Sequence, residues 1–205
     1  MKPLFIEKFL PQQVLDIAHS YMVTKHTHNT KSQLDTQTGS IITDYGDTLM
    51  ETMLDFSTSV VEQNVGKKLW PTYSYFRIYD KGSTLPIHKD RPSCEYTVAL
   101  CLGCDPVDVP YDIFVGEVDE KSDYKFYDDD ENWNRYRIDY KFPMLPNNAL
   151  LFKGMEKIHW REYCTHDYFM TVFLHYVDQE GEYKEYKFDK RSDIGAMGSG
   201  KDPYA

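Results

Sequence analysis

The sequence predicts an α+β protein in which two helices precede a long series of short strands. Residues 1–70 hold two segments whose apolar residues recur at helical spacing, and residues 71–180 hold short apolar and aromatic segments separated by turn residues. A helix with one apolar stripe buries that stripe against a neighbouring layer. We therefore expect one domain over residues 1–190, with the helical part, 1–70, packed on one sheet.

The first helix is expected from Pro11 to Met22 and the second from between Asp44 and Asp47 to Val65. We expect buried stripes that hold Val14, Ile17, Ala18 and Tyr21 in the first helix, and Leu49, Met50, Met53, Leu54, Phe56, Val60 and Val61, as far as Val65, in the second. Gly66 suits the left-handed conformation that ends many helices. Polar residues follow the first helix as far as Gly39, and we expect His26 and His28 to lie there in a solvated loop.

The remaining pattern predicts seven short strands. They are expected at Tyr73–Tyr79, Ile87–Asp90, Tyr96–Leu102, Tyr111–Val118, Arg135–Phe142, Ala149–Phe152 and Tyr168–Val177. Short antiparallel strands in this number favour a double-stranded β-helix, the jelly-roll core that is also called cupin-like. Its two sheets leave an open mouth where side chains from different strands meet.

Composition excludes some classes of function. The chain has 205 residues, 41% hydrophobic, and a formal net charge of −10, which argues against a general nucleic-acid surface. No apolar run is long enough to cross a bilayer and the N-terminus lacks the apolar segment of a secretory signal, so we expect no membrane association and a cytoplasmic location. Of the four cysteines, Cys101 and Cys104 form one Cys-x-x-Cys, which we interpret as packing residues because no second pair accompanies them.

Two segments stand apart from the predicted core. Residues 119–133 are acidic and aromatic, which suits either a solvated face or a lid over a substrate. Residues 191–205 offer little to bury, and we expect a flexible tail there.

The strongest candidate site is a possible metal centre at His88 and Asp90. Residues two apart in a strand point the same way, so this His-x-Asp directs an imidazole and a carboxylate toward one point. His159, just after an apolar strand, is the expected third ligand. Two His and one carboxylate form the facial triad of non-haem Fe(II) oxygenases. The motif is short, however, and also arises by chance in ordinary exposed or hydrogen-bonded pairs.

The residues around this triad carry a family resemblance. In chain order they are Tyr79, a Gly-containing turn, Pro86, His88 and Asp90, the run Pro146-Asn147-Asn148-Ala149-Leu150-Leu151-Phe152, His159 and a final apolar strand. From about Thr72 to Val177 the chain resembles the 2-oxoglutarate/Fe(II)-dependent oxygenases, particularly the prolyl 4-hydroxylase-like branch.

The resemblance implies an enzyme. His88, Asp90 and His159 would be the metal ligands and catalytic residues, with Fe(II) as cofactor, 2-oxoglutarate and O2 as cosubstrates and ascorbate as an optional reductant. The implied reaction couples decarboxylation of 2-oxoglutarate to hydroxylation of a C–H bond, for which a prolyl or other amino-acid side chain, in a peptide or free, is the expected substrate.

Cosubstrate contacts are expected around Tyr79, which matches the Tyr that helps this family hold 2-oxoglutarate. Alternation along the strand puts Tyr75 and Arg77 on the same face, and Thr97 follows on the next strand. Simple packing for Tyr75 and a backbone hydrogen bond for Thr97 are the alternatives.

One feature departs from the family pattern. A Lys or Arg usually stands about ten residues after the distal His and binds the far carboxylate of 2-oxoglutarate, whereas position 169 is Phe. We expect Arg161, two residues after His159, to replace it, because a guanidinium matches a carboxylate with two parallel hydrogen bonds. Arg77 is the rival and Arg91 comes third. The alternative is an ion pair between Arg161 and a surface carboxylate, such as Glu162 or an Asp of the lid segment 119–133.

Two other classes of protein remain open at this stage. The missing cation at position 169 suits a catalytically inactive jelly-roll module that binds a metal or ligand, since fold does not determine function. In a structural or interaction protein, His88 and His159 would be ordinary barrel residues. The sequence indicates neither the substrate nor the oligomeric state.

Overall fold

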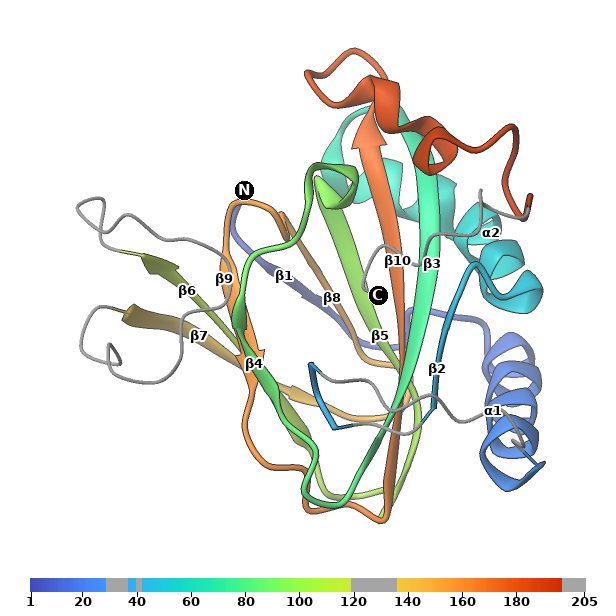
Figure 1. The fold of residues 1–205 in the computed structure, drawn as a ribbon, viewed down its shortest axis with the longest axis vertical. Helices are drawn as coiled ribbons and strands as arrows, with labels where there is room; N and C mark the ends of the chain where they lie inside the picture. The colour runs from blue at the N-terminus through green and yellow to red at the C-terminus, as the bar shows by residue number, and fades with distance from the viewer. Residues whose placement is uncertain (29–36, 40–41, 119–135, 197–205) are drawn as a thin grey trace.

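A computed structural model describes residues 1–28, 37–39, 42–118 and 136–196. Within these residues the strands form two antiparallel sheets that face each other, with both α-helices outside the larger one (Figure 1). The larger sheet has, in spatial order, β1 (Leu4–Ile6), β8 (Ala149–Phe152), β5 (Tyr96–Asp105), β10 (Tyr168–Asp178), β3 (Leu69–Asp80) and β2 (Ile42–Tyr45). The smaller has β4 (Leu85–His88), β9 (Ile158–Arg161), β6 (Tyr111–Val118) and β7 (Tyr136–Met144).

Alternation along the long strands creates two separate cores. On β10, Met170 and Val172 pack toward the helices, whereas Phe169 and Phe173 point between the sheets. The same parity holds on β3 and β5, so the space between the sheets is lined by their odd-numbered residues. These inward positions supply most of the site described below.

Both α-helices lie on the outer face of the larger sheet, with α2 above α1 in the view of Figure 1. The second, α2 (Thr48–Val65), begins at Asp47, whose carboxylate accepts hydrogen bonds from the backbone N–H groups of Leu49 at 3.0 Å and Met50 at 3.3 Å. It ends at Gly66 with φ of 75°, as expected from the sequence. The α+β double-stranded β-helix with outer helices is therefore confirmed.

The first helix, α1 (Gln12–His28), is longer than expected, and the interpretation of His26 and His28 as loop residues was wrong. Cationic and imidazole side chains suit the last turn of a helix, where the macrodipole is negative. The ring of His26 also lies 5.3 Å from that of Tyr168, and its Nε2 lies 3.6 Å from the Asp80 carboxylate. Contact with the sheet thus favours helix where the polar sequence alone indicated loop.

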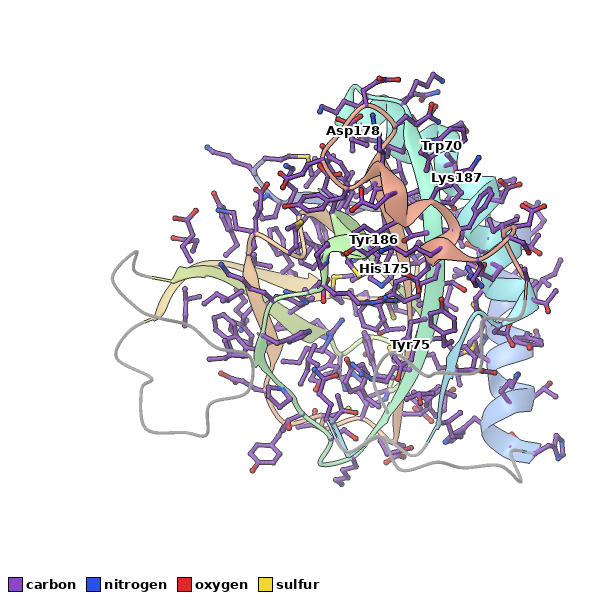
Figure 2. All side chains as sticks on the ribbon, turned by 45° about the horizontal axis from the view of Figure 1, so that its top comes forward. Trp70, Tyr75, His175, Asp178, Tyr186 and Lys187 are labelled. Atoms are coloured by element: carbon purple, nitrogen blue, oxygen red, sulfur yellow. The ribbon has the colours of Figure 1, made fainter. Side chains whose placement is uncertain are left out.

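The chain beyond β10 folds back over the end of the larger sheet. Its 3₁₀ segment, Lys184–Lys190, places Lys187 Nζ 3.8 Å from the Trp70 ring centroid (Figure 2). Arg191 then forms a buried ion pair of 2.8 Å with Glu51 of α2. Residues 191–196 therefore pack against the domain, whereas the rest of the expected tail, 197–205, lies outside the described residues, as does the acidic segment 119–133.

Several smaller features complete the fold. Strands β1, β2 and β9 were not predicted from the sequence. In β9 the apolar residues Ile158 and Trp160 alternate with His159 and Arg161, and all four side chains are buried. All four cysteines are free and buried. Among the described helices, none combines the length and apolar character needed to span a bilayer.

Candidate metal centre and cosubstrate pocket

Three side chains converge between the sheets at the end of β4. The pairing of β4 with β9 sets His88 directly opposite His159. Their Nε2 atoms lie 3.6 Å and 3.4 Å from the same oxygen, Oδ1 of Asp90. The structure therefore brings together the three residues that the sequence singled out, in a group of ligand atoms all within 4.8 Å of one another.

The protonation of the two imidazoles suits a metal. The Nδ1 atom of His88 lies 2.9 Å from the carbonyl oxygen of Pro86, and that of His159 lies 3.1 Å from the carbonyl oxygen of Lys157. A carbonyl only accepts hydrogen bonds, so each Nδ1 donates to the backbone and each Nε2 is the nitrogen left to bind a metal. Metal-binding histidines are commonly oriented by this kind of backbone contact.

The electrostatics indicate a site for a cation. Burial and the neighbouring His159 lower the pKa of His88 to about 3, so this imidazole is neutral near pH 7. Burial alone would raise the pKa of Asp90, but His159 and His88 outweigh burial and lower it, so the carboxylate is ionised. Two imidazole nitrogens and an ionised carboxylate that meet in one buried cluster form a donor set that a cation would complete.

Asp90 is held outside the strand on which it was expected. β4 ends at His88, and the Asp90 N–H donates to the Gly154 carbonyl at 3.0 Å. Gly154 also lets the carboxylate approach its backbone, because a Cβ at this position would lie 2.0 Å from Asp90 Oδ2. The turn after β8 therefore orients the ligand, which local alternation alone does not explain.

A second possible ligand group, Asp90 with Cys94 and His175, is a hydrogen-bonded cluster instead of another metal site. The Thr97 hydroxyl lies among these side chains, 3.1 Å from Asp90 Oδ2 and 3.2 Å from His175 Nδ1. Burial also raises the pKa of the Cys94 thiol well above its usual value, so without a metal this side chain is a neutral thiol.

A pocket opens beside the triad. It is lined by Gln37, Tyr75, Arg77, Leu85, His88, Asp90, His159, Phe173 and His175. Arg77 is almost fully buried and its Nη2 donates to Gln37 Oε1 at 2.9 Å, while its Cζ lies 5.2 Å from the Tyr75 ring centroid and 5.8 Å from that of Tyr79. Tyr75, Arg77 and Tyr79 thus share the inward face of β3, whereas Thr97 contacts Asp90 and does not line the pocket.

Arg161 lies deeper between the sheets with half of its guanidinium unused. It is 1% exposed, and its Nη1 donates to the carbonyl oxygen of Tyr111 at 2.7 Å. Its Nε and Nη2 have no hydrogen-bond partner in the described structure, and these two N–H groups form the side-on edge that binds a carboxylate through two parallel bonds. No ion pair joins Arg161 to Glu162 within the described residues, and the lid aspartates, the other partners considered, lie outside them.

The surroundings of Arg161 are aromatic. Its Cζ lies 4.8 Å from the ring centroid of Tyr111, 5.0 Å from that of Phe169 and 5.6 Å from that of Tyr79. The guanidinium therefore lies beside position 169, where the resemblance placed a cation. Arg91, the third candidate, is engaged elsewhere, because it forms a two-pronged ion pair with Asp189 at 3.0 and 2.8 Å.

Sequence reasoning missed four residues here: Gly154, Thr171, Phe173 and His175. The last three alternate on β10 and point inward, and the Thr171 hydroxyl is buried without a hydrogen-bond partner among the described residues. The sequence did contain a signal for Thr171 and His175, because both are polar residues on the inward face of a strand that is otherwise apolar. Gly154 had no such signal, since its role depends on a distant carboxylate.

Comparison with solved structures identifies the fold, although no family model and no curated protein sequence matches the chain. A Pseudomonas putida prolyl-4-hydroxylase aligns with TM-score 0.56 and 12% identity over 84% of this chain and 91% of that one. A Trichoplax adhaerens prolyl hydroxylase, in complex with a hypoxia inducible factor peptide fragment, aligns with TM-score 0.59 and 15% identity over 87% and 84%. The epimerase SnoN from nogalamycin biosynthesis, in complex with Fe3+, alpha ketoglutarate and nogalamycin RO, aligns with TM-score 0.59 and 12% identity over 86% and 78%. The chain thus has the fold shared by prolyl hydroxylases and other 2-oxoglutarate/Fe(II)-dependent oxygenases.

The close approach of Gly154 to Asp90 generates a prediction. Gly154→Ala should weaken Mn(II) or Fe(II) binding by about 10- to 100-fold, the cost typical of disturbing a group that orients a metal ligand. Isothermal titration of the metal-free protein measures the affinity. Gly103→Ala is the matched control, because its new Cβ would meet the flexible His19 ring at 2.3 Å, away from the triad. Equal metal affinity in wild type and Gly154→Ala would contradict the role of this glycine.

Proposed function

We propose that this chain is an Fe(II)- and 2-oxoglutarate-dependent oxygenase in which His88, Asp90 and His159 hold the metal. The observation that carries the proposal is the convergence of the Nε2 atoms of two histidines on one carboxylate oxygen, at 3.6 and 3.4 Å, beside a pocket between the sheets. The donor set is the facial triad of non-haem iron oxygenases, which leaves metal positions open for other ligands. When bound, the iron would supply O2 activation coupled to decarboxylation of 2-oxoglutarate.

The chain's own residues would bind and orient the cosubstrate. Arg161 presents two parallel donors in a water-poor, aromatic environment, where an unpaired guanidinium is costly and a carboxylate would satisfy it. It follows His159 by two positions on β9, so both side chains point between the sheets. The unpartnered Thr171 hydroxyl faces the same interior. These features support Arg161 as the residue that binds the far carboxylate of 2-oxoglutarate, with Tyr79 packed beside it.

Arg77 is the competing residue for that role. It lines the pocket with the triad, which Arg161 does not, and both guanidinium groups pack on Tyr79. We favour Arg161 because its side-on edge is unsatisfied, whereas Arg77 Nη2 already donates to Gln37.

Hydroxylation of a prolyl or other amino-acid side chain is the reaction that we propose. Two of the structural neighbours are prolyl hydroxylases, one of them with a peptide bound, while the epimerase SnoN holds a small molecule. The second candidate function is a catalytically inactive module of the same fold that binds a metal and a ligand. The specific observation in its favour is Phe169, which cannot bind a carboxylate where the family usually has a cation.

The metal ligands can be tested directly. His88→Ala should weaken Fe(II) binding by more than about 100-fold, because it removes a ligand where disturbing a supporting group already costs 10- to 100-fold. Metal content and titration measure the loss of Fe(II) affinity. Mn(II) should raise the melting temperature of the wild-type protein but not that of His88→Ala. His26→Ala, a histidine on α1 remote from the triad, is the control. Equal metal affinity in wild type and His88→Ala would rule out the assignment.

Turnover discriminates between the two candidate functions. The wild-type protein with Fe(II), ascorbate and O2 should release succinate from 2-oxoglutarate, and a true substrate should stimulate that release. Proline-containing peptides and free amino acids form the screen, read out by succinate and by mass of the product. A protein that binds Mn(II) and 2-oxoglutarate but forms no succinate would support the inactive module, and stimulation only by a small metabolite would exclude the peptidyl substrate.

The two arginines can be compared with one pair of variants. Arg161→Met should weaken 2-oxoglutarate binding to the Mn(II)-loaded protein by at least about tenfold, because it removes hydrogen bonds to a charged group worth about 1.5–3 kcal/mol each. Mn(II) affinity itself should change little. Arg77→Met is the matched variant and should retain 2-oxoglutarate. The reverse result would transfer the carboxylate-binding role to Arg77.

A further inference from the structure

We propose that Thr97 and His175 are positioning residues that restrict Asp90 to a single metal-binding oxygen. This inference rests on the proposed metal site. The Thr97 Oγ1 atom lies 3.1 Å from Asp90 Oδ2, the oxygen that faces away from the two histidines, and 3.2 Å from His175 Nδ1. Thr97 and His175 are directly paired across β5 and β10, so the sheet itself keeps them together.

The direction of these hydrogen bonds follows from the groups involved. A hydroxyl has one proton, and an ionised carboxylate can only accept, so Thr97 donates to Asp90 Oδ2. The other nearby acceptor, the Cys94 carbonyl oxygen, is neutral and lies farther away at 3.4 Å. Thr97 Oγ1 then accepts from His175, whose Nδ1 must carry its proton. The result is a directed chain from His175 through Thr97 to Asp90.

The His175 ring is fixed in the orientation that this chain requires. It is 3% exposed and lies 4.5 Å from the ring centroid of Tyr73 on β3. Figure 2 shows His175 and Tyr75 inside the molecule, and both line the pocket of the triad. His175 therefore cannot turn to another partner without disturbing the packing of two strands.

The two oxygens of Asp90 consequently have different environments. Oδ2 is hydrogen-bonded to Thr97 and lies against Gly154, where no Cβ would fit. Oδ1 is the oxygen that both histidine Nε2 atoms approach. A carboxylate can bind a metal through one oxygen or two, and binding through two would occupy a position that cosubstrate or O2 needs. The Thr97–His175 pair thus preserves an open position on the metal.

The polarity of the pair argues against a packing role alone. Thr97 is 1% exposed and its inward neighbours, including Ala99 and Phe152, are apolar. Burying a hydroxyl and an imidazole in such a place is unfavourable unless they bond to each other and to a third group. That third group is Asp90.

Two pairs of variants separate hydrogen bonding from packing. Thr97→Val keeps the shape but removes the hydroxyl, whereas Thr97→Ser retains it. His175→Phe removes the donor, whereas His175→Asn places an amide N–H near the position of Nδ1. Mn(II) affinity should fall by about 10- to 100-fold in Thr97→Val and His175→Phe, and the Ser and Asn variants should restore much of it.

A second measurement reports the coordination itself. Water-proton relaxation of the Mn(II)-loaded protein depends on the number of metal-bound waters. It should fall in Thr97→Val, because a released Oδ2 displaces a water, and should stay at the wild-type value in Thr97→Ser. Circular dichroism and thermal melting of each metal-free variant establish whether it folds. If Thr97→Val does not fold, the comparison of His175→Phe with His175→Asn provides the same test.

The outcomes are distinguishable from those of the proposed function. If wild type binds neither Mn(II) nor 2-oxoglutarate, the proposed function fails and this inference fails with it. If wild type binds both while Thr97→Val and His175→Phe show unchanged affinity and relaxation, the inference alone is overturned. Equal losses in the Val and Ser variants would assign Thr97 to packing and overturn it as well.

Discussion

The pairing of β4 with β9 is the constraint on which the site depends. Backbone hydrogen bonding sets His88 opposite His159, and each imidazole is then oriented by the carbonyl of the residue two positions earlier in the chain. The two Nε2 atoms are therefore placed by the sheet, which resists local rearrangement. Asp90, which lies beyond the end of β4, needs separate support and receives it from the backbone of Gly154 and the hydroxyl of Thr97.

The interior between the sheets combines two kinds of polar group. Around the triad two imidazole nitrogens and a carboxylate converge, and deeper in the barrel Arg161 offers two N–H groups that have no hydrogen-bond partner among the described residues. A cation would complete the first group and a carboxylate the second. The proposed cosubstrate, 2-oxoglutarate, has a metal-chelating end and a far carboxylate, so it corresponds in kind to both groups.

Much of the fold followed from periodicity because its elements carry a strong pattern. The second helix, from the Asp47 cap to Gly66, and strands such as β6 and β8 lie where alternation and capping residues placed them. The predictions that failed have one cause. At α1 beyond Met22 and at β9, contacts with other parts of the chain outweigh local preference, as when His26 packs against Tyr168.

The sequence by itself predicted the double-stranded β-helix, because alternation is a local property of the chain, and the His-x-Asp motif with the family resemblance singled out the three residues that converge between its sheets. Only the tertiary structure decided how those residues are supported. It placed Gly154 against Asp90, joined Thr97 to His175, left the side-on edge of Arg161 unpartnered and engaged Arg91 with Asp189. Each of these relations joins groups far apart in the sequence, so each depends on sheet pairing and close packing, which local spacing does not encode.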